Sequence, residues 1–190
     1  MMENIETLFR PKTNKYVEIL AKSEDNFQIE LIKELNVDDE NKINIFLSDN
    51  RDKISPNTLL VIKSLKKYFL YPKTLSFLAR LNKEPIAFII GIEIEKLDDK
   101  NLFQKEVNWG KGNTIYIFSH EINLKYSQRK YENILNKIAL NWLSKKGYEY
   151  ICGYEKKGRA EQIFPGCVII KRVENWKDSG KIYEYFKFSL

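Results

Sequence analysis

The residues best suited to carry chemistry lie in one stretch, "IFSHEINLKYSQRKYENIL", at positions 117–135. Its apolar start predicts a buried strand, and the spacing after its polar turn predicts an amphipathic helix. His120 has a side chain whose ordinary pKa lies near neutrality, and Glu121 stands next to it. A strand that runs directly into a helix points the first backbone N–H groups of that helix at open space, where anions bind. The stretch therefore predicts proton-transfer groups beside a candidate phosphate site.

The turn contains none of the glycines that phosphate-binding turns usually have. Glycine lets a phosphate approach the backbone amides closely, whereas Lys130 and Glu132 bring long side chains to this place. Arg129 and Lys130 offer charged donors, but a carboxylate at Glu132 repels an incoming anion. The pattern fits an altered phosphate site and an ordinary charged helix start equally well.

Adjacent strand residues point to opposite faces of a sheet unless a bulge intervenes, so at most one of His120 and Glu121 readily faces a substrate. Each also has a plain structural interpretation, as a buried histidine held by hydrogen bonds or as a surface carboxylate. The sequence does not choose between these two side chains.

The elements that must position these residues follow from the periodicity of the apolar side chains. The sequence first predicts a strand at 27–35, then a helix capped by Asp38 or Asp39, and then a helix that begins at Ser55 and Pro56 and ends before Pro72. A hairpin of strands at 74–81 and 85–95 follows, and then a strand at 113–124 and a helix at about 128–145. The chain ends with a strand at 148–155, a short helix at 158–164 and a closing hairpin at 167–188.

The predicted order indicates a mixed α/β or α+β sheet with flanking helices. Because strand–helix–strand units are almost always right-handed crossovers, strands 113–124 and 148–155 should be parallel in an otherwise mostly antiparallel sheet. Ligands prefer the carboxyl ends of parallel strands, where the turn after His120 lies.

Composition sets the outer limits. With 190 residues, 43% of them apolar, the chain can form one well-cored domain, which we place at 27–190 after an extension of unknown role at 1–26. We expect a cytoplasmic protein without a membrane segment, because no apolar run is long enough to span a bilayer. Two cysteines in apolar runs and a single histidine indicate buried thiols and no metal site. The net charge of +6 favours anionic partners, but the lysines are dispersed, so nucleic acid is a less favoured partner.

Over roughly residues 27–188, and especially in the stretch 115–147, the chain resembles the GNAT N-acetyltransferase superfamily. The family pattern is an apolar strand that ends in V-x-P, an aromatic residue, and a Q/R-x-x-G-x-G/A turn that opens a helix. The matching positions here are Ile122, Asn123 and Leu124 for V-x-P, Tyr126 for the aromatic residue, and Ser127, Gln128, Arg129, Lys130, Tyr131 and Glu132 for the turn. The turn departs from the pattern at Ser127, Lys130 and Glu132.

The resemblance implies transfer of an acyl group, most simply acetyl from acetyl-CoA or a related group from another acyl-CoA, to an amine of a small-molecule or protein acceptor. It implies that Ile122, Asn123 and Leu124 hold the pantetheine arm at the strand end, and that residues 128–132 form an altered phosphate turn. His120 or Glu121 would act as the base. Tyr154 would donate a proton, because Phe164 stands nearest to the place where family members often have a tyrosine.

Two other functions fit the same sequence. The turn without glycines suits a catalytically inactive GNAT-like protein that binds a partner. The basic charge suits a GNAT-like transferase whose donor is aminoacyl-tRNA or an acyl carrier protein, and binding to RNA would then weaken steeply with salt.

Overall fold

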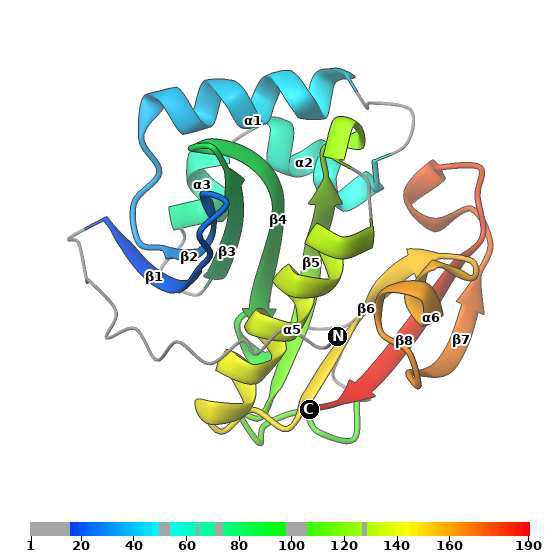
Figure 1. Ribbon diagram of the computed structural model, residues 1–190. Helices are drawn as coiled ribbons and strands as arrows, with labels where there is room; N and C mark the ends of the chain where they lie inside the picture. The colour runs from blue at the N-terminus through cyan, green and yellow to red at the C-terminus, as the bar shows by residue number, and fades with distance from the viewer. Residues whose placement is uncertain (1–15, 50–53, 64, 71–73, 98–105, 127–128) are drawn as a thin grey trace.

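The computed structural model describes residues 16–49, 54–63, 65–70, 74–97, 106–126 and 129–190, which form one eight-stranded sheet flanked by helices (Figure 1). The strands are β1 (Val17–Lys22), β2 (Phe27–Ile32), β3 (Thr74–Leu81), β4 (Glu84–Glu93), β5 (Thr114–Ile122), β6 (Tyr150–Lys156), β7 (Val168–Val173) and β8 (Tyr183–Ser189). The helices are α1 (Val37–Asp49), α2 (Pro56–Lys63), α3 (Leu65–Leu70), α5 (Arg129–Lys145) and α6 (Arg159–Ile163), with short 3-10 turns η1 (Ile94–Lys96), η2 (Leu124–Tyr126) and η3 (Trp176–Asp178).

The strands lie in the order β1-β2-β3-β4-β5-β6-β8-β7. All neighbours are antiparallel except β5 and β6, which are parallel and joined through α5. This confirms the predicted mixed sheet with one parallel pair. The β3–β4 hairpin turns at Asn82 and Lys83, whose φ angles of 51° and 71° match the twist of the flanking strands.

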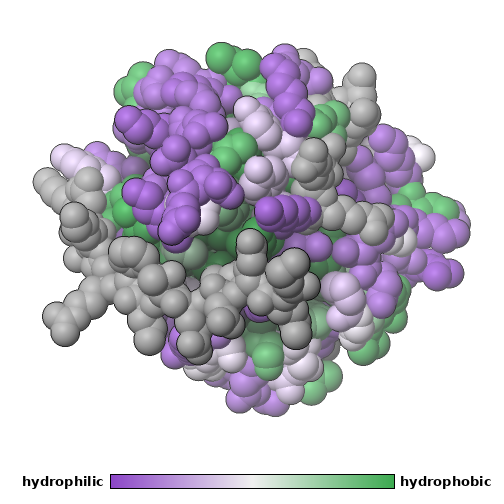
Figure 2. All heavy atoms as spheres, in the orientation of Figure 1, coloured by the Kyte–Doolittle hydropathy of each residue, from purple (hydrophilic) through white to green (hydrophobic). Residues whose placement is uncertain are grey.

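Helices cover both faces of the sheet (Figure 1). We call the side that carries α5 and α6 the α5 face, and the side that carries α1, α2 and α3 the α2 face. On the α5 face, Leu135 and Leu143 of α5 are buried in one hydrophobic core. On the α2 face, Ile43 and Leu47 of α1 pack with Phe88 of β4 in a second core. Figure 2 shows that hydrophilic side chains predominate on the outer surface over α1.

The two predicted helix starts on the α2 face have different outcomes. Ser55 caps α2 as predicted, because its Oγ accepts a hydrogen bond from the Thr58 N–H at 3.1 Å. The cap of α1 was predicted wrongly: Oδ1 of Asn36 accepts from the Asp39 N–H at 2.8 Å. The Asp39 carboxylate lies inside the first turn, where it binds Arg80.

Two segments differ from the predicted order of elements. The helix predicted from Pro56 onward is described as α2 and α3, on either side of Ser64, which lies outside the described residues. Residues 17–22 form β1, which pairs with β2 at the edge of the sheet. The role of the extension at 1–26 stays a prediction. Among the described residues, no helix is long and apolar enough to cross a membrane.

Candidate active site

The parallel strands β5 and β6 part near their carboxyl ends. Their paired register runs only from Thr114 and Tyr150 to Ile117 and Gly153, although β5 continues to Ile122 and β6 to Lys156. Gly153 permits close packing where the strands separate, because a Cβ there would lie 2.9 Å from the Phe186 ring and 3.2 Å from the Ile117 carbonyl oxygen. We call the region between residues 118–122 of β5 and 154–156 of β6 the strand opening. It is the predicted ligand position at the ends of the parallel strands.

A β-bulge decides which way the candidate bases point. Ser119 pairs with Ile90 and Ile117 pairs with Gly91, so Phe118 is an extra residue in β5. Phe118 and Ser119 both face α2 and α3: Phe118 stacks on Tyr68, and the Ser119 hydroxyl lies 2.7 Å from that of Thr58. The alternation then resumes with His120 on the α5 face and Glu121 on the α2 face.

His120 is buried and held by α5. Its Nε2 lies 2.9 Å from Oδ1 of Asn136, and its Nδ1 lies 3.6 Å from Oε1 of Glu132. Glu132 and Asn136 are one helical turn apart, so both side chains reach the same ring. Burial first, and then the charge of Arg159, lower the pKa of His120 to about 3. The imidazole is therefore neutral at pH 7, and it is a weak base.

Glu121 belongs to a hydrogen-bond network with the start of α2. One of its carboxylate oxygens accepts from the Thr58 hydroxyl at 2.7 Å and from the Ser55 N–H at 3.3 Å. Burial raises the pKa of Glu121, although these hydrogen bonds oppose the shift. The network fixes the carboxylate at the end of β5, beside the strand opening.

The facing strand β6 contributes a second carboxylate, on Glu155. Burial raises the pKa of Glu155 to about 7, and the nearby charges of Glu121 and Glu132 act in the same direction. Arg159 of α6 opposes this shift, and its Nε lies 3.5 Å from the Glu155 carboxylate. Nη2 of Arg159 also donates to Glu132 at 3.2 Å. One guanidinium thus joins carboxylates from β6 and α5.

Two tyrosines belong to the strands next to the opening, Tyr154 on β6 and Tyr183 on β8. Tyr154 lies in an aromatic cluster, where it stacks on Trp176 with ring centroids 3.8 Å apart. Tyr183 of β8 is also buried. Burial raises the pKa of Tyr183, and the charges of Glu155 and Glu121 raise it further. The charges of Glu155 and Glu121 therefore both act on the Tyr183 hydroxyl.

The predicted coenzyme residues occupy several different environments. Ile122 is partly buried against the core, the Asn123 N–H donates to the Ile86 carbonyl at 2.7 Å, and Leu124 is exposed in η2. Lys130 is exposed in the first turn of α5. Tyr131 packs on Phe27 with ring centroids 5.2 Å apart. Arg129 begins α5, and Gln128 lies outside the described residues.

No protein-family model matches the sequence, and no curated protein matches it. Solved structures do match. An Escherichia coli enzyme that acetylates an alanine of a ribosomal protein aligns at a TM-score of 0.60 and 11% identity over 86% of this chain and 93% of that one. The GNAT-family acetyltransferase of Streptococcus pneumoniae aligns at 0.58 and 12% over 86% and 99%. An aminoglycoside 6'-N-acetyltransferase complexed with coenzyme A aligns at 0.59 and 9% over 85% and 96%.

This chain has the GNAT acetyltransferase fold. The sequence identities are low, so the likeness concerns the fold, and the residues in the strand opening must carry the argument about chemistry. Among the described residues, no cluster of His, Cys, Asp and Glu side chains is suited to hold a metal ion.

Sequence reasoning missed four polar residues of this GNAT-fold site, which are Asn136, Glu155, Arg159 and Tyr183. The position of Glu155 could have been found, because it ends the second parallel strand directly after Tyr154. Asn136 could also have been found, since it lies four residues after Glu132 on one helix face. Arg159 and Tyr183 come from other elements, and no local pattern places them at the opening.

Proposed function

We propose that the protein is an N-acyltransferase that transfers an acyl group, most simply acetyl from acetyl-CoA, to an amine. The parting of β5 from β6 carries this proposal. Beyond Ile117 the described register gives β5 no ladder with β6, so the β5 peptide groups on that edge are available to an extended ligand. A pantetheine arm has amides that can pair with such an edge as a further strand would. Ile122, Asn123 and Leu124 lie at the end of this strand.

The start of α5 is the proposed site for the coenzyme diphosphate. The backbone N–H groups of its first turn suit an anion, and the exposed Lys130 adds a charged donor. Glu132 opposes anion binding, but its carboxylate is paired with Arg159 rather than exposed as an isolated charge. The start of α5 would thus act as an altered phosphate turn in which the Lys130 side chain takes over from glycine.

In the proposed reaction the amine nitrogen attacks the thioester carbonyl carbon, the C–N bond forms, and the C–S bond breaks. The amine loses a proton to Glu155, directly or through water, and its pKa of about 7 suits a base near neutral pH. Glu121 on the opposite strand is the second candidate base. His120 is held against α5 by its hydrogen bond with Asn136 and does not take the proton, because its pKa is low.

The departing thiolate takes a proton from a tyrosine. The charges of both carboxylates act on Tyr183, whereas Tyr154 stacks on Trp176. Substitution by phenylalanine tests each hydroxyl while keeping the ring. If Tyr183 is the donor, Tyr183→Phe lowers kcat about a hundredfold and Tyr154→Phe leaves it nearly unchanged. The reverse order would assign the role to Tyr154.

Isothermal titration with acetyl-CoA is the first test of the proposal. We expect binding in the micromolar range, weakened by Lys130→Ala and unaffected by Lys137→Ala, which changes another exposed lysine later on the same helix. Release of free thiol is then followed with a panel of primary amines. Glu155→Gln should lower the rate, and Glu174→Gln, at an exposed position outside the strand opening, should not. Absence of binding by the native protein would contradict an acyl-CoA donor.

Glu132 favours donors other than an acyl-CoA, because a carboxylate in the first turn of α5 disfavours a nucleotide diphosphate. An acyl carrier protein presents pantetheine without that diphosphate, and aminoacyl-tRNA lacks pantetheine altogether. If acetyl-CoA does not bind, thiol release from an acyl carrier protein would support the first. Salt-sensitive binding of charged tRNA would support the second. Failure of all three donors would leave a catalytically inactive partner-binding protein as the function.

A further inference from the structure

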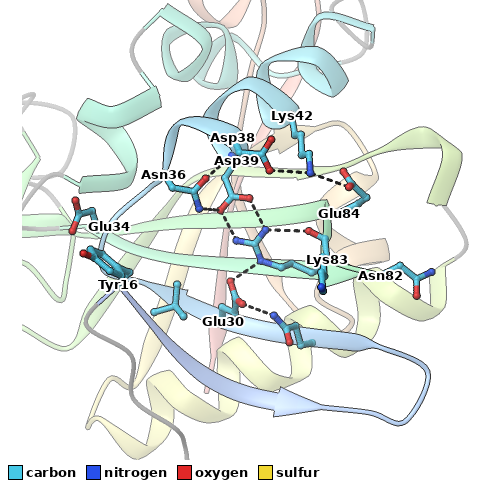
Figure 3. A pocket seen from close by; sticks show the side chains of 13 residues that line it. Tyr16, Glu30, Glu34, Asn36, Asp38, Asp39, Lys42, Asn82, Lys83 and Glu84 are labelled. Atoms are coloured by element: carbon cyan, nitrogen blue, oxygen red, sulfur yellow. Dashed lines mark hydrogen bonds and ion pairs between the residues drawn. The ribbon is translucent and has the colours of Figure 1, made fainter.

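A cavity of about 590 Å³ lies between the start of α1 and the strands β1 to β4 (Figure 3). This size is typical of sites for small molecules. None of its lining residues belongs to the strand opening, so it is separate from the proposed acyl-transfer chemistry. We call it the α1 cavity.

Arg80 forms a buried charged network at the base of the α1 cavity. Its Nη1 and Nη2 each donate to one oxygen of Asp39 at 2.6 Å, and its Nε donates to Glu30 at 2.8 Å. Nη1 also reaches the Lys83 carbonyl oxygen at 3.4 Å. These contacts hold α1 against β2 and β3.

The network leaves spare acceptors and almost no spare donors. A guanidinium has five N–H groups, and the contacts of Arg80 use four of them. A carboxylate can accept about four hydrogen bonds, yet Glu30 accepts only from Arg80 and Gln28 among the described residues. A ligand that completes this network must therefore bring donors.

The charge of the α1 cavity leads to the same conclusion. Five carboxylates and three cations line it, which leaves two negative charges in excess: Glu30, Glu34, Asp38, Asp39 and Glu84 against Lys42, Arg80 and Lys83. Lys42 is engaged at the rim, where it pairs with Asp38 and Glu84 at 2.9 Å each.

The charges are also unevenly distributed along the α1 cavity. Tyr16 and Glu34 lie at one end, and Lys83 lies toward the other end (Figure 3). The Glu34 side chain is exposed, and among the described residues it has no ion pair or hydrogen bond. A cation would therefore bind toward the end of the cavity that carries Glu34, away from the Lys83 ammonium.

We propose that the α1 cavity binds a small organic cation with primary ammonium groups. One ammonium group pairs with Glu34 at the end of the cavity, a second donates hydrogen bonds to Glu30, and the charge of the ligand offsets the excess of carboxylate. The α1 cavity is separate from the proposed acyl-transfer site, so binding of a ligand to the cavity can be tested whether or not this protein transfers acyl groups.

The test uses three probes of matched length that differ in charge: butane-1,4-diamine, butane-1,4-diol and succinate. Calorimetric titration should detect binding of the diamine alone. Glu34→Gln should weaken it about three- to fivefold, as loss of one partly exposed charge pair does. Lys83→Asn removes the opposing charge while tolerating the left-handed backbone at φ 71°, and it should strengthen binding by a similar factor. Glu24→Gln, at an exposed position outside the α1 cavity, is the matched control.

Equal binding of diol and diamine would overturn the proposal, as would preferential binding of succinate or no binding of any probe. So would a diamine affinity that Glu34→Gln and Glu24→Gln change equally. Circular dichroism of each variant confirms that the protein remains folded. Titration of acetyl-CoA into the same samples tests the strand opening separately. Absence of diamine binding to the α1 cavity predicts nothing about acetyl-CoA binding, and the reverse is also true.

Discussion

Nη2 of Arg159 donates a hydrogen bond to Oε1 of Glu132 at 3.2 Å, which joins the first turn of α5 to α6. Glu132 stands where the GNAT turn pattern has a small residue, and its charge is the chief objection to an anion site there. The same Oε1 lies 3.6 Å from Nδ1 of the buried His120. The first turn of α5 therefore has a structural role whatever its ligand: Glu132 joins it to α6 through Arg159, and the same carboxylate lies beside the buried His120.

Removal of the Arg159 guanidinium should weaken binding of acetyl-CoA. In Arg159→Gln the Glu132 charge is no longer offset, so it repels the diphosphate, and we expect about tenfold weaker binding, equivalent to about 1.4 kcal/mol. Titration calorimetry measures the effect. Adding Glu132→Gln to Arg159→Gln should restore most of the affinity, and no recovery in the double variant would show that Arg159 acts independently of Glu132. Arg172→Gln, at a mostly exposed arginine on β7, is the control.

Ionisation of Glu155 should destabilise the fold above neutral pH. Its pKa in the folded protein is about 7, above the ordinary value of 4.5, so folding favours the protonated form. The associated stability is fully present below pH 4.5 and is lost as the pH rises through 7. Glu155→Gln should therefore gain about 3 kcal/mol relative to the native protein between pH 4.5 and pH 8. Urea unfolding at both pH values measures the gain, and a difference that does not change with pH would contradict the raised pKa of Glu155.

His120 should make the protein sensitive to acid. Its pKa in the folded protein is about 3, below the ordinary value of 6.5, so folding favours the neutral ring. Stability is complete above pH 6.5 and falls as the pH drops toward 3. His120→Gln should remove about 2 kcal/mol of this loss at pH 5. The free energy of unfolding of the native protein and of the variant is measured at pH 7 and at pH 5. The difference between the two proteins is then compared at the two pH values, because the packing cost of the substitution is the same at both and cancels. A pH-independent difference would contradict the shift.

Gly153 should tolerate no side chain where β5 and β6 part. A Cβ would lie 2.9 Å from the buried Phe186 ring and 3.2 Å from the Ile117 carbonyl oxygen, so the ring must shift and β5 must give way slightly. We expect Gly153→Ala to lower the free energy of unfolding by about 1–3 kcal/mol. It should also weaken acetyl-CoA binding, because the strand opening changes shape. Gly91→Ala is a comparison for crowding alone, since its Cβ would meet Ile115 at 2.7 Å and Gly91 pairs within the β4–β5 ladder. Equal losses of affinity in both variants would contradict a specific role for Gly153.

The sequence determined the sheet and the edge of the sheet at which a ligand is expected. Alternating apolar residues defined β2 to β6, and the chirality of crossover connections required β5 and β6 to be parallel. These local and chain-order effects also predicted a ligand position at the carboxyl ends of the two parallel strands. Ser55 was recognisable as a cap because capping depends on residues within one turn.

Only the tertiary structure decided which side chains meet in the strand opening. The extra residue Phe118 reverses the faces of His120 and Glu121, and a bulge depends on the pairing of β5 with β4 rather than on β5 alone. The pKa values of His120 and Glu155 follow from burial and from Arg159, which lies far from His120 along the chain. Desolvation and charge pairing arise between elements, so a linear pattern cannot reveal them.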